Sequence, residues 1–456
     1  MRHIAVIDIG KTNAKLLSID LSSGTERIVA RRSNDILRSA PYPHFDADGL
    51  WSFFLGALGE LGRGGPVDAI SITTHGASAA LVDAQGALAL PLLDYEHPGP
   101  DDLAADYDAI RPPFAETGAP RLPGGLNLGA QLFWQARRFP EAFHRTHHIL
   151  TYPQYWAFRL TGIAASEATS LGCHTDLWSP SGRRFSTLVD RLGWTPLFPP
   201  LRPAGSVLGT LLPEVAHATG LPEATPVLCG IHDSNASLVP WLGGGAPCSV
   251  LSTGTWMIVM SLGGGTVTLD PSRDTLINVN ARGEPVPTAR FMAGREFDEL
   301  TRGQATAPSD GAERAVLVSR LMVLPSLHPD TGPFPGQTAE WSPAEPDDPA
   351  RRTVAASCYV ALMGAACLSL VGAAGDIIVE GPLGANRTFA RMLATATGRA
   401  VLVAGQGAGT GLGAALLAGP LNAPRPAPRR IDPETDDLWR DYAALWQDRV
   451  AARDAR

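Results

Sequence analysis

The sequence contains little lysine, few cysteines and no phosphate-binding motif of the P-loop type. Its five cysteines form no CxxC pair and no Cys/His spacing typical of a zinc site, which argues against a disulfide scaffold and favours a reducing compartment. The 45 acidic and 37 basic residues give a net charge of −8, so a general attraction to nucleic acid or anionic membranes is excluded. The absence of GxxxxGK[ST] excludes a P-loop.

We expect neither a membrane-spanning nor a secretory segment. The apolar run at the N-terminus is too short for a signal peptide. Residues 353–375 form one uncharged stretch of sufficient length, but it consists mostly of Ala, Gly, Ser and Cys. We interpret it as a buried helix that leads into a strand at 377–379. We therefore expect a cytoplasmic protein with neither a membrane nor a nucleic acid as partner.

The chain has 456 residues, 45% hydrophobic and 18% charged, which is enough for two globular domains. Strands alternate with helices, which indicates the α/β class. The Gly-rich run at 243–247 is the best candidate for a domain boundary, and residues 301–352 are predicted to form long loops with a short strand near 321–324. The predicted division is 1–242, 243–430 and a terminal amphipathic helix at 431–456.

Two stretches share one pattern of apolar strand, small polar turn and second apolar strand. The first has strands at 4–8 and 14–20 around a tip at Gly10, Lys11, Thr12 and Asn13. The second has strands at 248–252 and 256–262 around Thr253, Gly254 and Thr255. Because the stretches lie about half a chain apart, they indicate two related domains that each open with a hairpin.

The first hairpin holds the only two lysines of the chain, Lys11 and Lys15, beside 35 arginines. A compact ammonium suits a phosphate at close range, although chance clustering on a solvated turn explains the pattern equally well. Backbone N–H groups and hydroxyls at both tips suit phosphate oxygens. Asp8 at the end of the first strand could hold Mg²⁺ through water, or simply cap the turn.

Three further motifs carry weaker signals. Asp233 follows an apolar strand in Gly-Ile-His-Asp, where a carboxylate can act as a general base on a hydroxyl or can cap a helix, the commoner role. His75 lies in a polar loop after a predicted strand. The sequence from Gly409 to Ala414 matches GxGxxA, but lacks the following helix length and acidic residue of a dinucleotide fold, so we interpret it as a glycine turn with a tightly packed helix.

Taken together, the residues resemble the FGGY carbohydrate kinases, and within them the rhamnulokinases and L-fuculokinases. The resemblance rests on the order and spacing of motifs over most of the chain. They are Asp8-Ile-Gly-Lys-Thr12, Thr74-His-Gly76, Leu160-Thr-Gly162 with Glu167 and Thr169, Gly230-Ile-His-Asp233, Leu251-Ser-Thr-Gly-Thr-Trp256, Val379 to Asn386 and Ala404 to Ala408. The resemblance implies a two-domain sugar-kinase/actin-like ATPase fold, with ribonuclease H-like domains and a cleft between them.

The resemblance also implies a role for each motif. Asp233 would be the catalytic base on the sugar and Asp8 would help to place Mg²⁺. ATP would contact both hairpin tips, with adenine near Gly381, Pro382, Asn386, Gly407 and Ala408. The sugar site would include His75, Gly76, Asp94 and Glu96, together with Asp233. ATP and Mg²⁺ are the implied cofactors, and a homodimer is a default expectation only.

Some residues depart from the family pattern. The tetrapeptide that names the family is absent, Ser78 and Glu96 stand where aspartates are expected, and Gly405 to Gly411 lacks the usual glutamate. The first two bear on the identity of the sugar, and the last on nucleotide contacts. We therefore expect a kinase for a ketose such as L-fuculose or L-rhamnulose. The alternatives are a kinase for xylulose or erythritol, a non-catalytic sugar or nucleotide sensor on the same fold, and a dinucleotide enzyme based on the GxGxxA match.

Overall fold

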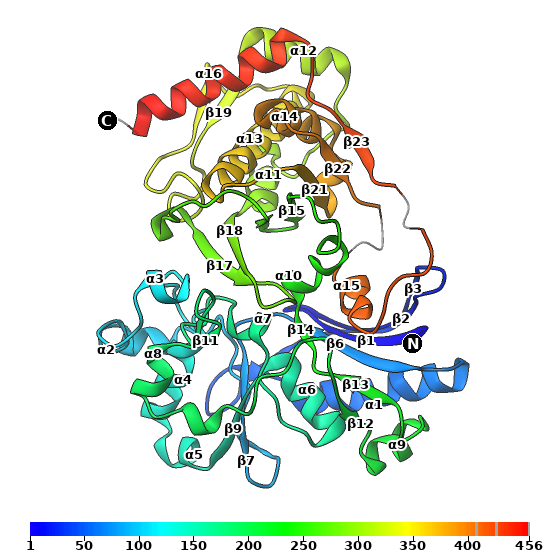
Figure 1. Ribbon diagram of the computed structural model, residues 1–456. Coiled ribbons are helices and arrows are strands. Elements are labelled where there is room, and N and C mark those ends of the chain that lie inside the picture. The colour runs from blue at the N-terminus through cyan, green and yellow to red at the C-terminus, as the bar shows by residue number, and fades with distance from the viewer. Residues whose placement is uncertain (406–408, 425–426, 455–456) are drawn as a thin grey trace. The chain divides into compact units, whose positions relative to one another are not determined.

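The computed structural model describes residues 1–405, 409–424 and 427–454, which form two compact units (Figure 1). Among the described residues, unit 1 comprises 1–243, 277–285 and 409–424. Unit 2 comprises 244–276, 286–405 and 427–454. The first long break falls between Gly243 and Gly244, within the glycine-rich run. The chain also crosses between the units later, and the terminal helix packs with unit 2.

Unit 1 is built on a mixed sheet in which a hairpin is extended by a parallel strand. The two hairpin strands pair with Asp8 opposite Lys15, and the parallel strand places Thr73 beside Asp8. The sheet order is β12(Val207–Thr210), β13(Pro226–Leu228), β6(Ala69–Thr74), β1(His3–Ile9), β2(Asn13–Asp20) and β3(Thr25–Ser33), with β14(Ile231–His232) also paired to β6. The predicted first hairpin is thus confirmed.

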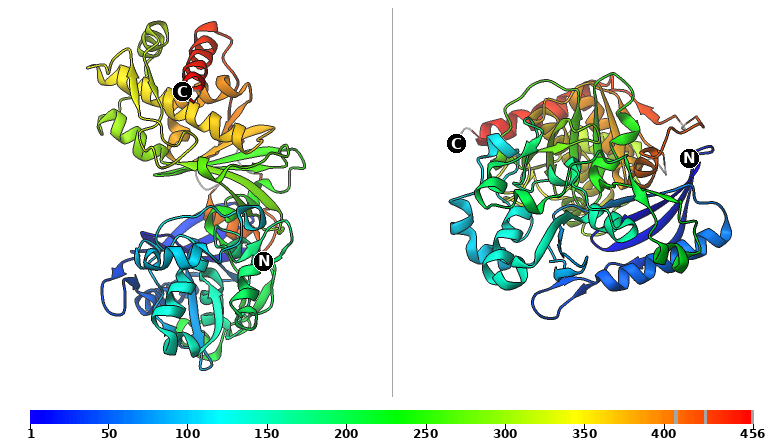
Figure 2. Two further views of the ribbon diagram at one scale, coloured as in Figure 1. Left: turned by 90° about the vertical axis from the view of Figure 1, so that its left-hand side faces the viewer. Right: turned by 60° about the horizontal axis from the view of Figure 1, so that its bottom comes forward.

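Successive side chains of β1 point to opposite faces of the sheet, and each face packs in a separate hydrophobic core. Ala5, Ile7 and Ile9 pack with α1(Ala47–Gly64), whereas Ile4 and Val6 pack with α15(Thr410–Leu416). In Figure 1, α15 accordingly lies above β1 and β2, with α1 below, and Figure 2 shows α1 running beside the blue strands. By the same alternation, Asp8 belongs to the face that carries α15.

Unit 2 repeats this arrangement around the second hairpin. Its two hairpin strands pair antiparallel, and a parallel strand places Val379 beside Leu251. The sheet order is β17(Thr275–Val279), β18(Pro285–Phe291), β16(Met257–Leu262), β15(Cys248–Thr253), β21(Asp376–Glu380), β22(Val401–Val403) and β23(Arg429–Ile431). The shared pattern predicted from the two hairpins is therefore confirmed at the level of sheet topology.

The long apolar stretch of unit 2 forms a core helix, α13(Pro349–Leu370). It is the one described helix that is long and apolar enough to cross a membrane, and 78% of that stretch is buried inside the protein. The prediction of a buried helix before the strand at 377–379 is confirmed, although the helix ends at Leu370. Around it pack α11(Ala293–Thr301), α12(Asp310–Ser319), α14(Arg387–Thr397) and α16(Asp437–Asp454).

One sequence prediction about unit 2 is partly wrong. Residues 301–352 contain a ten-residue helix, α12, and not only loops around a strand. Ser309 caps this helix, because its side chain accepts from Ala312 N, and Val316 and Leu317 are buried. The short strand near 321–324 is present as β19(Met322–Leu324), paired with β20(Glu340–Ser342).

The remaining elements of unit 1 surround a small sheet of β8(Leu88–Leu90), β7(Ala79–Asp83) and β9(Thr146–Thr151). Two short strand pairs, β4(Ile36–Leu37) with β5(His44–Phe45) and β10(Trp178–Ser179) with β11(Arg184–Phe185), complete its strands among the described residues. Its helices include α2(Ala104–Asp108), α3(Phe114–Thr117), α4(Leu128–Arg138), α5(Pro140–His144), α6(Tyr152–Thr161), α7(Ala168–Leu171), α8(Thr187–Arg191), α9(Pro213–Thr219) and α10(Asp233–Ala236).

Candidate active site

The tip of the β1–β2 hairpin is a tight turn that the neighbouring chain holds in place. Gly10 N donates to the Asn13 carbonyl at 2.8 Å, and Asn34 Nδ2 donates to the Gly10 carbonyl at 2.9 Å. Thr12 is exposed at the tip, whereas Asn13 Oδ1 accepts two hydrogen bonds from the Arg31 guanidinium. The predicted phosphate turn is therefore anchored; Thr12 is exposed, and its hydroxyl oxygen accepts from Asn13 Nδ2 at 2.9 Å.

Asp8 lies beside this tip, and its carboxylate faces Lys15 on the paired strand. Lys15 Nζ is 3.6 Å from Asp8 Oδ2, and 13% of the Asp8 side chain is exposed. Burial raises the pKa of Asp8 to about 6; Lys15 opposes this shift and the nearby Asp233 carboxylate adds to it. At neutral pH the carboxylate is therefore largely ionised and available as an oxygen ligand.

The described residues contain no group of three or more His, Cys, Asp or Glu side chains that could hold a metal ion. Mg²⁺ takes most of its ligands from water and from substrate phosphates, with one or two protein carboxylates. The surroundings of Asp8 therefore fit a Mg²⁺ ion that arrives with a nucleotide.

Asp233 is the first residue of the short helix α10, and the N-cap position belongs to His232. The capping interpretation of Asp233 is thus wrong in its position, although Asp233 Oδ1 accepts from the neighbouring Ser234 N at 2.6 Å. Burial raises the pKa of Asp233 to about 6, and the hydrogen bonds from Ser234 limit that rise. Since 30% of the side chain remains exposed, a hydroxyl can approach the carboxylate.

The buried His232 ring lies next to the Asp233 carboxylate. His232 Nε2 lies 3.2 Å from Asp233 Oδ1, and His232 Nδ1 lies 2.9 Å from Asn235 Nδ2. Burial lowers the pKa of His232 to about 4, so the ring is neutral at physiological pH. An amide donor at Nδ1 leaves the proton of the neutral ring on Nε2, the nitrogen that faces Asp233 Oδ1 and Cys173 Sγ. Cys173 Sγ, 3.3 Å from Nε2, completes the ring's surroundings.

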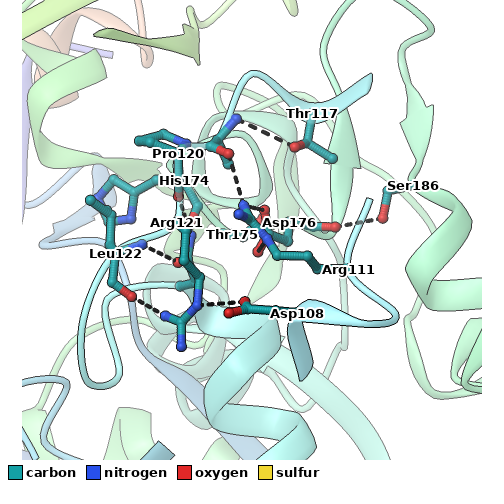
Figure 3. Close-up of polar contacts among 12 residues, drawn as sticks. Asp108, Arg111, Thr117, Pro120, Arg121, Leu122, His174, Thr175, Asp176 and Ser186 are labelled. Carbon is teal, nitrogen blue, oxygen red and sulfur yellow. Dashed lines mark hydrogen bonds and ion pairs between the residues drawn. The ribbon is translucent and has the colours of Figure 1, made fainter. Parts of the chain in front are cut away.

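The turn that follows Cys173 is fixed by the polar network in Figure 3. His174 and Asp176 both adopt left-handed backbone conformations, with φ of 43° and 65°. The fully buried Asp176 carboxylate forms an ion pair with Arg111 at 2.8 Å, and its backbone carbonyl accepts from Ser186 Oγ at 2.6 Å. This network holds an unfavourable backbone turn next to the thiol that contacts His232.

His75 and Gly76 lie against the same group of side chains. A Cβ atom on Gly76 would lie 2.9 Å from both Cys173 Sγ and His232 Nε2, so only glycine fits there without displacement. His75 Nδ1 is 2.8 Å from the Gly76 carbonyl, which assigns its proton to Nδ1 and leaves Nε2 as an acceptor. This buried Nε2 and the buried Ser78 hydroxyl have no hydrogen-bond partner among the described residues.

Asp94 and Glu96 lie in a loop whose Tyr95 contacts His75. Asp94 N donates to the Pro43 carbonyl at 3.0 Å, and Asp94 Oδ1 accepts from Glu96 N at 3.1 Å. The centre of the Tyr95 ring, between them in sequence, lies 5.3 Å from the centre of the His75 ring. The residues predicted for the sugar site are therefore gathered in unit 1, and Lys11, predicted for phosphate, contacts Asp94 there.

In unit 2, the second hairpin tip is joined to the turn after β21. Thr253 Oγ1 donates to the Glu380 carbonyl at 2.6 Å and accepts from Leu383 N at 3.2 Å. Gly381 has a φ of +88°, and a Cβ atom there would lie 2.1 Å from the Thr253 carbonyl oxygen. Two segments about 130 residues apart in sequence are thereby locked together.

These segments border a pocket of about 670 Å³ that contains four of the predicted nucleotide residues. Its predicted lining residues are Gly254, Thr255, Pro382 and Asn386. Asn386 contributes to the wall while its side chain caps α14, since Oδ1 accepts from Phe389 N at 3.0 Å. The remaining lining residues are Gly294, Arg295, Phe297, Asp298, Glu299 and Leu383.

The contribution of α11 to this pocket was not among the sequence predictions, because no motif falls within its residues. Gly294 N donates to the Thr255 carbonyl at 3.2 Å, which brings the start of the helix to the hairpin tip. The predicted adenine contacts at Gly407 and Ala408 lie outside the described residues.

Two consecutive segments of the chain match the models of the two domains of one protein family. Residues 109–240 match the family model for the N-terminal domain of the FGGY family of carbohydrate kinases. Residues 245–427 match the family model for the C-terminal domain of carbohydrate kinase FGGY.

Individual relatives agree with these matches. The structure of a carbohydrate kinase from Novosphingobium aromaticivorans is 39% identical, with a TM-score of 0.89, covering 98% of this chain and all of that one. The L-fuculokinase of Salmonella typhi is 30% identical over 56% of this chain, and the match spans only 56% of the relative's length. A xylulose kinase from Rhodospirillum rubrum is 20% identical over 98% of this chain and 99% of that one, with a TM-score of 0.76, and shares the fold.

Proposed function

Because the chain belongs to the FGGY family of carbohydrate kinases, we propose that it transfers the γ-phosphate of ATP to a hydroxyl of a ketose, with a 6-deoxy-ketohexose such as L-fuculose or L-rhamnulose preferred. In this proposal unit 1 binds and activates the acceptor, and unit 2 binds the nucleotide. The L-fuculokinases among the relatives support the choice of sugar class.

The observation that carries the proposal is the Asp233 carboxylate, which is partly exposed, is held by hydrogen bonds from Ser234 and lies 3.2 Å from the neutral His232 ring. With a pKa of about 6, it is mostly ionised at pH 7 and basic enough to accept the proton of a hydroxyl as that oxygen attacks. The acceptor oxygen forms a bond to the γ-phosphorus while the bond from phosphorus to the ADP oxygen breaks. Asp233 retains the proton until solvent removes it.

In our proposal, the β1–β2 hairpin of unit 1 offsets the negative charge of the ATP phosphates. The Thr12 tip offers a hydroxyl and backbone N–H groups, and Asp8 suits one ligand position of Mg²⁺ bound to the nucleotide. When bound, Mg²⁺ offsets the phosphate charge, which is the main requirement of phosphoryl transfer. Lys15 balances the Asp8 carboxylate and lies next to the same turn. ATP is the phosphoryl donor that the family implies, and the pocket beside Thr255 is our proposed nucleotide site.

The charges of the acceptor region favour a neutral substrate. Asp94, Glu96 and Asp233 contribute three carboxylates, against one ammonium from Lys11. An anionic sugar acid would meet net repulsion, whereas hydroxyl groups can donate to carboxylates. The unpartnered His75 Nε2 and Ser78 Oγ supply further polar atoms for hydroxyl groups. Pocket shape decides between ketoses that differ in one hydroxyl orientation.

The test is ADP release with ATP, Mg²⁺ and a panel of L-fuculose, L-rhamnulose, D-xylulose, erythritol and D-gluconate. We expect release that depends on a neutral sugar and falls at least about a thousandfold in Asp233→Asn, since the amide accepts no proton. Asp106→Asn, on an exposed helix turn, is the matched control and should behave as wild type.

The alternatives give different results in the same assay. Turnover only with xylulose or erythritol would replace the preferred sugar and keep the reaction. Binding of sugar and ATP without turnover, unchanged in Asp233→Asn, would identify a sensor. The cytoplasmic location and the homodimer stay predictions from the sequence.

A further inference from the structure

The only two lysines of the chain lie four residues apart in one hairpin, yet their ammonium groups have different partners. Lys15 Nζ is 3.6 Å from Asp8 Oδ2, beside the hairpin turn. Lys11 Nζ contacts Asp94 Oδ1 and lies 3.4 Å from Glu96 Oε2. A common phosphate role for both lysines therefore does not follow from their shared position in sequence.

The surroundings of Lys11 are those of an enclosed cation. Its Nζ lies 4.5 Å from the centre of the Tyr95 ring and 5.1 Å from that of Phe45. Only 20% of the Lys11 side chain and 11% of the Asp94 side chain are exposed. Aromatic faces and a partly buried carboxylate each favour the charged ammonium at this place. Moving Lys11 to a phosphate would leave Asp94 without its cation.

The same two rings connect Lys11 to His75. The His75 ring centre lies 5.0 Å from that of Phe45 and 5.3 Å from that of Tyr95. Lys11 is thus part of the cluster that holds the predicted sugar residues, although it starts from the predicted phosphate turn. A single side chain reaches from the hairpin tip into the acceptor region.

We propose that Lys11 is a specificity-determining residue of the acceptor site, which fixes Asp94 and Glu96 side by side so that they accept hydrogen bonds from neighbouring hydroxyl groups of a neutral substrate. This inference rests on the proposed function. Without the ammonium, two carboxylates two residues apart repel each other, and the loop loses its defined geometry. With it, the cluster presents carboxylate acceptors and an ammonium donor, a pattern that suits adjacent hydroxyls. Glu96, whose side chain is 64% exposed, provides the accessible face.

Steady-state kinetics distinguish an acceptor role from a phosphate role. We expect Lys11→Met to raise KM for the accepted sugar at least about tenfold and to change KM for ATP less than twofold. Lys11→Arg should recover only part of this loss, because a guanidinium fork does not replace a compact ammonium between two carboxylates and two rings. Lys15→Met, the matched variant in the same hairpin, should instead raise KM for ATP. A Lys11→Met enzyme with raised KM for ATP and unchanged KM for sugar would overturn the inference.

A measurement on the unaltered protein covers the case in which Lys11→Met fails to fold. With lysine labelled by ¹³C at Cε, the chain yields two lysine signals, assigned by Lys11→Arg and Lys15→Arg. We expect the turned-over sugar of the panel to shift the Lys11 signal, and Mg²⁺·ADP to shift the Lys15 signal. A Lys11 signal that responds to Mg²⁺·ADP and not to the sugar contradicts the inference. If no sugar is turned over, the proposed function itself is wrong and the inference falls with it; turnover without a Lys11 response rejects the inference alone.

Discussion

At the scale of single residues, burial destabilises the ionised carboxylate of Asp233, our proposed base. Burial withholds water from its carboxylate and raises the pKa to about 6, while hydrogen bonds from the Ser234 N–H and hydroxyl limit that rise. Asp8, whose pKa is also raised to about 6, faces the same region from β1, and Lys15 partly offsets its charge. The site thus holds two carboxylates that titrate just below neutral pH.

This titration predicts the pH dependence of turnover. Because only ionised Asp233 accepts a proton, kcat/KM should rise about tenfold per pH unit below pH 6 and level off above it. Asp8 titrates in the same range and can steepen the rise. A kcat/KM that stays constant from pH 5 to pH 8 would contradict the assignment of the base.

The same raised pKa predicts that stability falls with rising pH, whereas turnover rises. Folding raises the pKa of Asp233 from 3.8 to about 6, so the folded state keeps its proton in a range where the unfolded state has lost it. The contribution to stability is full below pH 3.8 and is lost as the pH rises through about 6. Asp233→Asn should therefore be about 1–2 kcal/mol more stable than wild type at pH 8, and nearly equal to it at pH 4. Urea unfolding at both pH values measures the difference; an Asn variant that is less stable at pH 8 would argue against the desolvation of Asp233.

The His232 contact predicts a second effect on catalysis. His232→Leu removes the polar ring nitrogen that lies 3.2 Å from Asp233 Oδ1, so the carboxylate should become harder to ionise, and the acidic limb of the kcat/KM profile should move to higher pH. His232→Gln, which retains an amide donor, should keep more activity than the leucine variant. Equal loss in both variants with an unmoved limb would mean that His232 acts through packing alone.

The sequence indicates candidate site residues, but it does not indicate which of them contact one another. His75 and Asp233 stand out in motifs and the family resemblance adds Asp94 and Glu96; all four lie in unit 1, and their role stays a prediction. The contact between Lys11 and Asp94 joins residues 83 positions apart and leaves no local pattern in the sequence. The prediction that Lys11 contacts phosphate rests on the scarcity of lysine and on its place in the hairpin, and it stays a prediction beside the contact with Asp94.

At the scale of elements, the glycines of the GxGxxA match serve helix packing. A Cβ atom on Gly413 would lie 1.8 Å from the Ala236 carbonyl oxygen, where α15 packs on α10. The interpretation as a tightly packed helix is confirmed for the described part of this motif. The contact also fixes the short helix that begins with Asp233.

This packing predicts opposite effects of one substitution at two helix glycines. Gly413→Ala forces α15 away from α10 and should lower the free energy of unfolding by about 1–3 kcal/mol. Gly56→Ala, on the exposed side of α1 with no atom within 4 Å of the new Cβ, should raise it by about 0.5–1 kcal/mol. Urea denaturation of both variants measures these changes, and a neutral Gly413→Ala would contradict the close helix contact.

Helices and strands with a clear apolar pattern in the sequence were predicted well, and those without such a pattern were not. Both hairpins and the core helix α13 agree with the expected strands and buried stretch. Helix α12 was predicted as loop because prolines and acidic residues surround it, although Ser309 offers a cap. Its stability comes from tertiary contacts such as the buried Glu313, whose Oε1 accepts from Thr388 Oγ1 at 2.6 Å. Local composition does not encode such contacts.

At the scale of the whole molecule, the expected family and the actin-like two-domain fold are confirmed by the two family models and by the solved relatives. The terminal helix α16 is an integral part of unit 2. Tyr442 OH donates to the Leu321 carbonyl and Trp446 Nε1 to the Val323 carbonyl, both at 2.7 Å. The sequence indicated an amphipathic helix that must dock, but it did not indicate that β19 is the surface it covers.

Loss of this docking should destabilise the protein. Trp446 is 2% exposed, so Trp446→Ala removes a large buried ring together with the hydrogen bond to Val323. We expect a loss of about 3–5 kcal/mol in the free energy of unfolding, measured by chemical denaturation with Gln447→Ala as the exposed control on the same helix. A loss below about 1 kcal/mol would mean that α16 contributes little to the fold.

We propose that Asp233 activates a sugar hydroxyl for attack on the γ-phosphate of ATP. Phosphorus NMR of the products formed from ATP, Mg²⁺ and each panel sugar tests it most directly, because it distinguishes a sugar phosphate ester from free phosphate. We expect one ester with a neutral ketose in wild type and in Asp106→Asn, and none in Asp233→Asn over the same time. Equal ester formation in Asp233→Asn, or free phosphate as the only product in wild type, would contradict it.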